Sequence, residues 1–172
     1  ELTWADTVLA RPDGQGVHCS GVTYEVYIRA LREAVASEGD IDPSLLAGLK
    51  EPWYVRGSGE RGPVDALLEA GLASPVEHLD ALQPGDFVQF WRNNGNGHSA
   101  IFVGFRRTRT GSVRSLVFWS AQSSSSGIGR RYVSVGHRPS QIAPGRWYAA
   151  RAQVPSPRPA HTEPTRTDPG VP

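Results

Sequence analysis

Two different spacings of apolar residues divide the chain. Between Cys19 and about Ser37 the apolar side chains recur every three to four residues, which predicts an amphipathic helix. Gly39 follows that run as a stop signal. From Leu82 onward the period changes to two, which predicts strands. A helix therefore precedes a region of sheet.

The second half of the chain is expected to contain five strands, separated by turn signals, at 87–91, 98–105, 115–121, 131–135 and 146–150. Short helical pieces at 43–49 and 64–70, with a glycine-rich stretch at 57–62, fill the segment before them. One helix followed by closely spaced strands indicates an α+β domain with an antiparallel sheet of about five strands.

The composition changes again near the end. From residue 155 the chain is rich in Pro, Thr and charged residues, and it has few apolar side chains to bury. We therefore expect one domain over residues 1–154 and a disordered, Pro-rich tail over residues 155–172. A chain of 172 residues is long enough for one sizeable core.

The formal net charge of +1 offers no electrostatic footprint for nucleic acid. The arginine clusters at 106–109 and 130–131 are interpreted as solvated strand ends. No apolar run approaches the length that spans a bilayer, and no signal-peptide core precedes the fold. We expect no nucleic acid partner, no membrane span and a monomer.

The chain has one cysteine, Cys19, at the start of the predicted helix. A lone cysteine is commonly a small buried apolar residue. At a helix start, however, unpaired backbone N–H groups favour the thiolate, and a distant histidine such as His98 can hold the proton. The neighbouring His18 is expected to face solvent. The remaining histidines have no metal-like spacing, so neither a metal nor a cofactor is expected.

Three segments together resemble the NlpC-type and CHAP cysteine peptidases and amidases: Cys-Ser-Gly at 19–21, Leu-Gln-Pro-Gly-Asp-Phe-Val at 82–88, and Gly-His-Ser-Ala-Ile-Phe-Val-Gly at 97–104. Those families are papain-like enzymes that act mostly on peptidoglycan. The resemblance implies a papain-like fold, with Cys19 as nucleophile and His98 as base. It also implies a polar residue on the next strand, within 119–122, that orients the imidazole.

At that third position many relatives have His, Asn, Asp or Glu, whereas this chain offers Ser120 and Gln122. The amide oxygen of Gln122 can accept from an imidazole N–H, and the shorter Ser120 needs a closer approach. We therefore favour Gln122 as the orienting residue. Trp53, Tyr54 and Ser120 are candidate substrate contacts, although the two aromatic residues could equally belong to the core.

The expected function is hydrolysis of peptide or amide bonds, most often in bacterial cell-wall peptidoglycan, by an exported enzyme of the periplasm, wall or extracellular space. The wall assignment depends on the resemblance alone. One alternative is a non-catalytic wall-binding module of the same fold. Another is an effector or toxin domain that cuts or acylates another protein, with or without an inhibitor partner.

Overall fold

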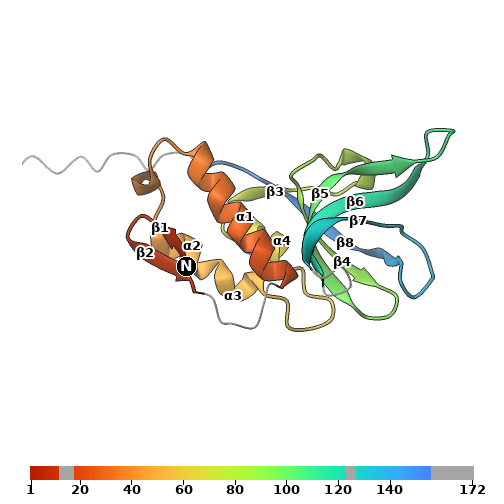
Figure 1. The fold of residues 1–172 in the computed structure, drawn as a ribbon, viewed down its shortest axis with the longest axis horizontal. Helices are drawn as coiled ribbons and strands as arrows, with labels where there is room; N and C mark the ends of the chain where they lie inside the picture. The colour runs from red at the N-terminus through yellow and green to blue at the C-terminus, as the bar shows by residue number, and fades with distance from the viewer. Residues whose placement is uncertain (12–17, 123–126, 156–172) are drawn as a thin grey trace, which may run out of the picture.

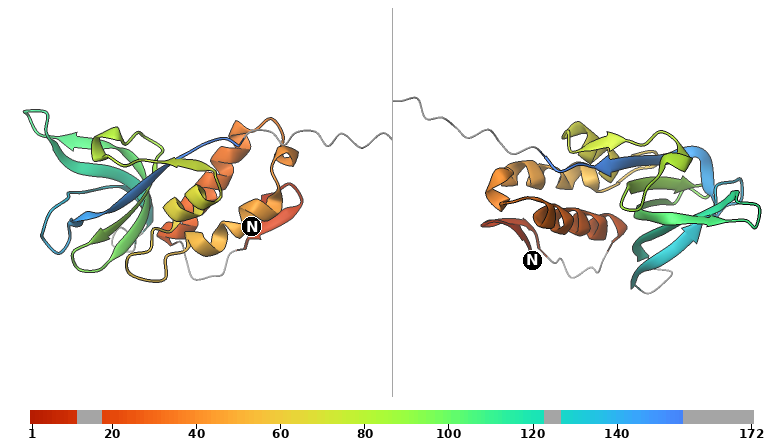
Figure 2. Two further views of the ribbon diagram at one scale, coloured as in Figure 1. Left: turned by 180° about the vertical axis from the view of Figure 1, so that it is seen from behind. Right: turned by 90° about the horizontal axis from the view of Figure 1, so that it is seen from above.

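The computed structural model describes residues 1–11, 18–122 and 127–155. Its helices gather at one end of the molecule and its main sheet lies at the other, as the three views in Figures 1 and 2 show. The segment just before Cys19, residues 12–17, and residues 156–172 of the expected tail lie outside the described residues.

Helix α1 (Cys19–Ala34) runs across the helical end and directs its first turn toward the sheet (Figure 1). It buries one face, which includes Tyr24, Tyr27 and Ile28. The helix ends three residues earlier than expected. Ser37 instead caps a separate 3-10 turn, η1 (Glu38–Asp40), so Gly39 lies inside that turn.

The short helical pieces of the middle segment are present. They are α2 (Pro43–Gly48), α3 (Lys50–Trp53) and α4 (Pro63–Glu69), followed later by the 3-10 turn η2 (Leu79–Ala81). The expected helices at 43–49 and 64–70 are thereby confirmed to within one residue at each end. Within the described ranges, no helix is long and apolar enough to cross a membrane.

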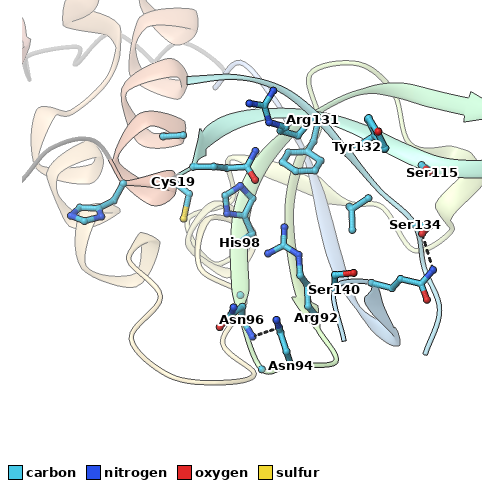
Figure 3. Close-up of a pocket in the computed structure, with 18 of the residues that line it drawn as sticks. Cys19, Arg92, Asn94, Asn96, His98, Ser115, Arg131, Tyr132, Ser134 and Ser140 are labelled. Atoms are coloured by element: carbon cyan, nitrogen blue, oxygen red, sulfur yellow. Dashed lines mark hydrogen bonds between the residues drawn. The ribbon is translucent and has the colours of Figure 1, made fainter. Parts of the chain in front are cut away.

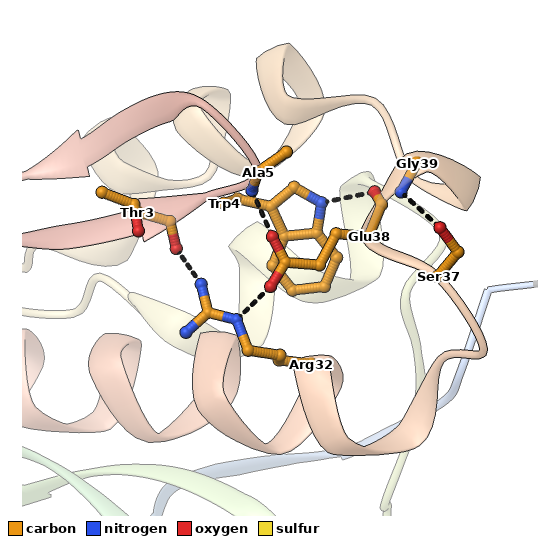
Figure 4. A network of polar contacts seen from close by, with 7 residues as sticks. All are labelled: Thr3, Trp4, Ala5, Arg32, Ser37, Glu38 and Gly39. Atoms are coloured by element: carbon orange, nitrogen blue, oxygen red, sulfur yellow. Dashed lines mark hydrogen bonds and ion pairs between the residues drawn. The ribbon is translucent and has the colours of Figure 1, made fainter.

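The sequence analysis did not predict the N-terminal hairpin of β1 (Leu2–Trp4) and β2 (Thr7–Ala10). The hairpin is attached to the end of α1 by a polar network (Figure 4). The indole N–H of Trp4 donates to the carbonyl of Glu38 at 2.8 Å. The Glu38 carboxylate accepts from the Ala5 N–H and from Arg32, which also donates to the Thr3 carbonyl.

The main sheet has six antiparallel strands in the order β3-β8-β4-β5-β6-β7, so the α+β class with an antiparallel sheet is confirmed. Its strands are β3 (Ala73–Pro75), β4 (Phe87–Arg92), β5 (Gly97–Arg107), β6 (Val113–Gln122), β7 (Gly127–Val133) and β8 (Ile142–Ala152). The short β3 was not expected, and β7 begins four residues before the predicted position.

Two separate hydrophobic clusters cover the two faces of this sheet. One contains the hairpin and the helices and reaches the sheet at Phe87. The other contains side chains of β4, β5 and β6 that point to the opposite face, among them Phe90, Phe102 and Phe118. Because successive side chains of a strand alternate between faces, β4 contributes to both clusters. One face of the sheet therefore packs against the helices, and the other face carries the second cluster and borders a pocket.

Candidate active site

Cys19 is the first residue of α1 and is partly exposed. Its backbone is held by the buried Thr23, whose hydroxyl lies 3.0 Å from the carbonyls of both Cys19 and Ser20. Trp53 in turn donates its indole N–H to the Thr23 oxygen at 3.1 Å. These contacts fix the first turn of the helix, and with it the position of the thiol.

His98 is the second residue of β5 and is only 7% exposed. Its ring lies between Phe90 and Phe118, with centroid distances of 5.5 and 5.4 Å. The residue before it must be glycine, because a Cβ on Gly97 would come within 2.7 Å of the Trp91 ring. Among the described residues, the His98 Nε2 atom is buried and has no hydrogen-bond partner. That nitrogen is therefore free to accept a proton from a nearby group.

The fold brings Cys19 and His98 together. Their chain neighbours contact each other directly, since the hydroxyls of Ser20 and Ser99 lie 3.2 Å apart in the interior. Both residues line the same two pockets, and Figure 3 shows them facing one hollow from α1 and β5. No hydrogen bond joins these two described side chains. Catalytic hydrogen bonds are often long in a ligand-free enzyme and tighten on substrate binding.

The two pockets meet at this pair of residues. The larger, which we name the sheet pocket, encloses about 1580 Å³ over the hollow face of β4 to β7. The smaller, the loop pocket, encloses about 340 Å³ against residues 55–58, which lead into the glycine-rich stretch, and against residues of β4. Cys19 and His98 line both of them. An extended ligand that occupied both pockets would therefore pass next to the Cys19 thiol.

Gln122 and Ser120 lie in different environments. Ile101 of β5 pairs with Trp119 of β6, and continuing that register by three residues sets Gln122 opposite His98 on the same face. Gln122 also lines the sheet pocket. Ser120 is fully buried, and its hydroxyl donates to the Ser99 carbonyl at 2.7 Å. The geometry favours Gln122 as the orienting residue, which stays a prediction, and Ser120 is inaccessible to substrate.

The candidate substrate contact at Trp53 is wrong. Trp53 is fully buried in the helical core, where it stacks edge-on against Tyr24 and Phe87. Tyr54 is partly buried against the same cluster and lines neither pocket at Cys19. Its hydroxyl lies against Gly21 in the first turn of α1, 3.1 Å from where a Cβ would stand. The core interpretation of these aromatics is the one the structure supports.

Sequence reasoning missed Arg92, the last residue of β4. It lines the sheet pocket with Cys19 and His98 (Figure 3). Its guanidinium lies 5.1 Å from the centre of the Phe90 ring. Burial lowers the pKa of Arg92, and its electrostatic interaction with Cys19 acts in the opposite direction. Burial, and then the positive charge of Arg92, lower the pKa of His98 to about 4. His98 is therefore neutral at pH 7.

His18, the residue before the helix, is exposed and makes no side-chain cap, which agrees with its expected position in solvent. The loop at 12–17, just before this residue, lies outside the described residues. Across the part of the chain that the structure describes, no group of three or more His, Cys, Asp or Glu side chains could hold a metal ion.

No family model, curated protein or solved structure matches the chain. The site itself combines a thiol at a helix start, a neutral imidazole and a nearby guanidinium.

Proposed function

We propose that this protein is a cysteine hydrolase of peptide or amide bonds. The observation that carries the proposal is the position of Cys19 and His98 at the junction of two pockets. A nucleophile with substrate room on both sides can take an acyl group on one side and release an amine on the other. A structural cysteine needs no such room, and a histidine that served only packing would not leave a buried nitrogen unpaired.

The reaction begins with transfer of the Cys19 proton to His98, which is neutral and can accept it. The sulfur then attacks the carbonyl carbon of the substrate, and the C–N bond breaks as His98 returns the proton to the amine. A thioester on Cys19 remains. Water, deprotonated by His98, attacks the thioester, so a carboxylic acid leaves and the thiol is restored. The backbone N–H of Cys19, at the free start of α1, is a donor for the oxyanion.

Gln122 orients the imidazole in this proposal. An amide oxygen accepts a hydrogen bond from the ring and selects a tautomer, but it carries no charge to stabilise an imidazolium. Arg92 acts on the other partner, since a guanidinium close to Cys19 stabilises the thiolate. The pair therefore depends on a cation beside the sulfur rather than on a carboxylate behind the histidine.

The substrate proposed is the peptide of bacterial cell-wall peptidoglycan, cut by an exported enzyme. The support for this choice is the resemblance of segments 19–21, 82–88 and 97–104 to enzymes of that class. The two pockets share Cys19 and His98 as lining residues, which is compatible with a chain that continues on both sides of the cleaved bond. Acyl transfer to another protein would use the same groups. Its products distinguish it from hydrolysis, because transfer gives a new amide and hydrolysis gives a carboxylic acid.

The test is incubation of the protein with purified peptidoglycan, followed by mass spectrometry of the released fragments. We expect new amine and carboxyl ends from the wild type, and none from Cys19→Ala or from wild type treated with iodoacetamide. Cys19→Ala should keep the wild-type melting temperature, because the thiol is partly exposed. Fragments released equally by wild type and a folded Cys19→Ala protein would overturn the proposal, as would no cleavage of peptidoglycan or its isolated peptides.

A further inference from the structure

The near-neutral net charge conceals a separation of charge along the chain. Residues 1–86 contain fifteen acidic and six basic residues, whereas residues 87–155 contain ten arginines and no acidic residue or lysine. In the described structure, only one of those ten, Arg151, forms an ion pair, with Asp86 at 2.8 Å. The strands β4 to β8 thus carry a large excess of unpaired positive charge.

Three of these arginines, Arg92, Arg114 and Arg131, line the sheet pocket, and none of the residues that line it is acidic. Arg92 is the most informative because it is partly buried and has no carboxylate partner among the described residues. A guanidinium withdrawn from water without an anion is costly. A negatively charged ligand in the pocket would offset that cost.

Arg131 fixes the distance at which such a ligand group would bind. It pairs with Phe118 across β6 and β7, and the Phe118 ring contacts the His98 ring. Phe118 stands opposite Phe102, which is four residues along β5 from His98. The backbones of Arg131 and His98 are therefore two strands and four residues apart, which is roughly 16 Å. An extended peptide covers that distance in about five residues. Figure 3 shows both side chains on the same hollow.

From this arrangement we propose that the sheet pocket is a subsite for a carboxylate of the substrate, bound by Arg131 about five residues from the cleaved bond. The inference rests on the proposed function and names its substrate class: an acidic peptide. The side-chain amides and hydroxyls of Asn96, Ser134 and Gln141, which also line the pocket, can complete the hydrogen bonds of a carboxylate.

The test uses peptides released from peptidoglycan, with their free carboxyls either intact or converted to amides. Binding to Cys19→Ala protein is measured by calorimetry, and cleavage by wild type is measured as kcat/KM. We expect the intact peptides to bind about tenfold more tightly than the amidated ones, a difference of the size of one charge-assisted hydrogen bond. Arg131→Gln should remove that preference.

The control variant is Arg109→Gln, which removes an exposed arginine outside the pocket. It should keep the preference for intact peptides. Equal loss in both variants would mean that the charge of the sheet acts as a whole, and equal binding of intact and amidated peptides, or of neither, would overturn the subsite. If the wild type cleaves intact and amidated peptides equally well, the hydrolase proposal holds and the subsite proposal is refuted. If intact peptides bind preferentially but the wild type cleaves neither kind, the subsite proposal holds and the hydrolase proposal is refuted.

Discussion

At the scale of single residues, burial and the charge of Arg92 together set the electrostatics of the site. Burial first, and then the charge of Arg92, lower the pKa of His98, so the imidazole is neutral at pH 7. Arg92 also interacts favourably with a negative charge on the Cys19 sulfur. In many thiol–imidazole pairs the protonated imidazole itself stabilises the sulfur. In the mechanism proposed above, a guanidinium on the neighbouring strand takes that part, and it keeps its charge at any pH of interest.

Arg92→Gln should therefore slow the reaction of Cys19 with iodoacetamide at pH 7 by a factor of about three to ten, because the thiolate loses a nearby positive charge. The rate is measured by mass spectrometry of the single alkylated cysteine. Arg92→Lys keeps the charge and should retain most of the rate. Arg109→Gln removes a distant exposed arginine and should change nothing. Equal rates in wild type and Arg92→Gln would exclude this role.

The lowered pKa of His98 also links stability to pH. The unfolded chain binds a proton on this residue near pH 6.5, while the folded protein does so only near pH 4. Stability therefore falls as the pH falls from 6.5 toward 4. Between pH 7 and pH 5 the wild type should lose about 2 kcal/mol more than His98→Asn, which has no such group. Urea unfolding at the two pH values measures this, and parallel losses would contradict the burial argument.

The positions of Cys19 and His98 could be predicted from the sequence because Cys19 is the first residue of α1 and His98 is the second residue of β5, where local signals are strongest. Arg92 could not be predicted in the same way. It meets His98 only through the pairing of β4 with β5, in which Phe90 stands opposite His98. An arginine two residues beyond Phe90 on the same face is then a diagonal neighbour of the histidine. The missing information was the register in which β4 pairs with β5.

At the scale of elements, the site depends on how α1 docks against β5. The Ser20 and Ser99 hydroxyls join them, and Ser99 also donates to the buried amide oxygen of Gln89 on β4 at 2.7 Å. This short chain of hydrogen bonds lies directly beneath Cys19 and His98. It fixes the helix start relative to two strands at once.

Ser99→Ala should lower the free energy of unfolding by about 1–3 kcal/mol, because the buried Gln89 oxygen loses its donor. Activity should fall through kcat more than through KM, since the thiol and the imidazole lose their fixed relation while the pockets remain. Chemical denaturation and steady-state kinetics on the same preparations measure the two effects. Ser112→Ala, in an exposed turn, is the matched control. A Ser99→Ala protein with wild-type stability and kcat would show that the docking is independent of this contact.

The elements missed from the sequence are short ones. Strands β1 and β3 have three residues each and β2 has four, which is too few for an alternating pattern to be recognised. Their existence depends on partners far away in the chain, namely Glu38 for the hairpin and β8 for β3. By contrast, α1, β4, β5 and β6 are long and periodic, and the sequence predicted each of them.

At the scale of the whole molecule, the fold class followed from the order of a helix and several strands, but the distribution of charge did not. The sequence-based expectation used the net charge of +1 and interpreted the arginine clusters as solvated strand ends. Most of the acidic residues that balance them lie among the helices, at the other end of the molecule (Figure 1). The net charge adds the acidic and basic residues together, whereas the folded structure places them at different ends of the molecule.

That separation has a consequence for copies of the protein in solution. With one acidic end and one basic end, two molecules attract head to tail, although their net charges are almost zero. The attraction reaches about 30 Å in about 0.01 M salt and about 8 Å in about 0.15 M salt. We therefore expect the second virial coefficient from light scattering at pH 7 to be negative in dilute buffer and to rise when sodium chloride is added. A coefficient that falls or stays constant would contradict this, whereas a rise means that added salt keeps the protein in solution.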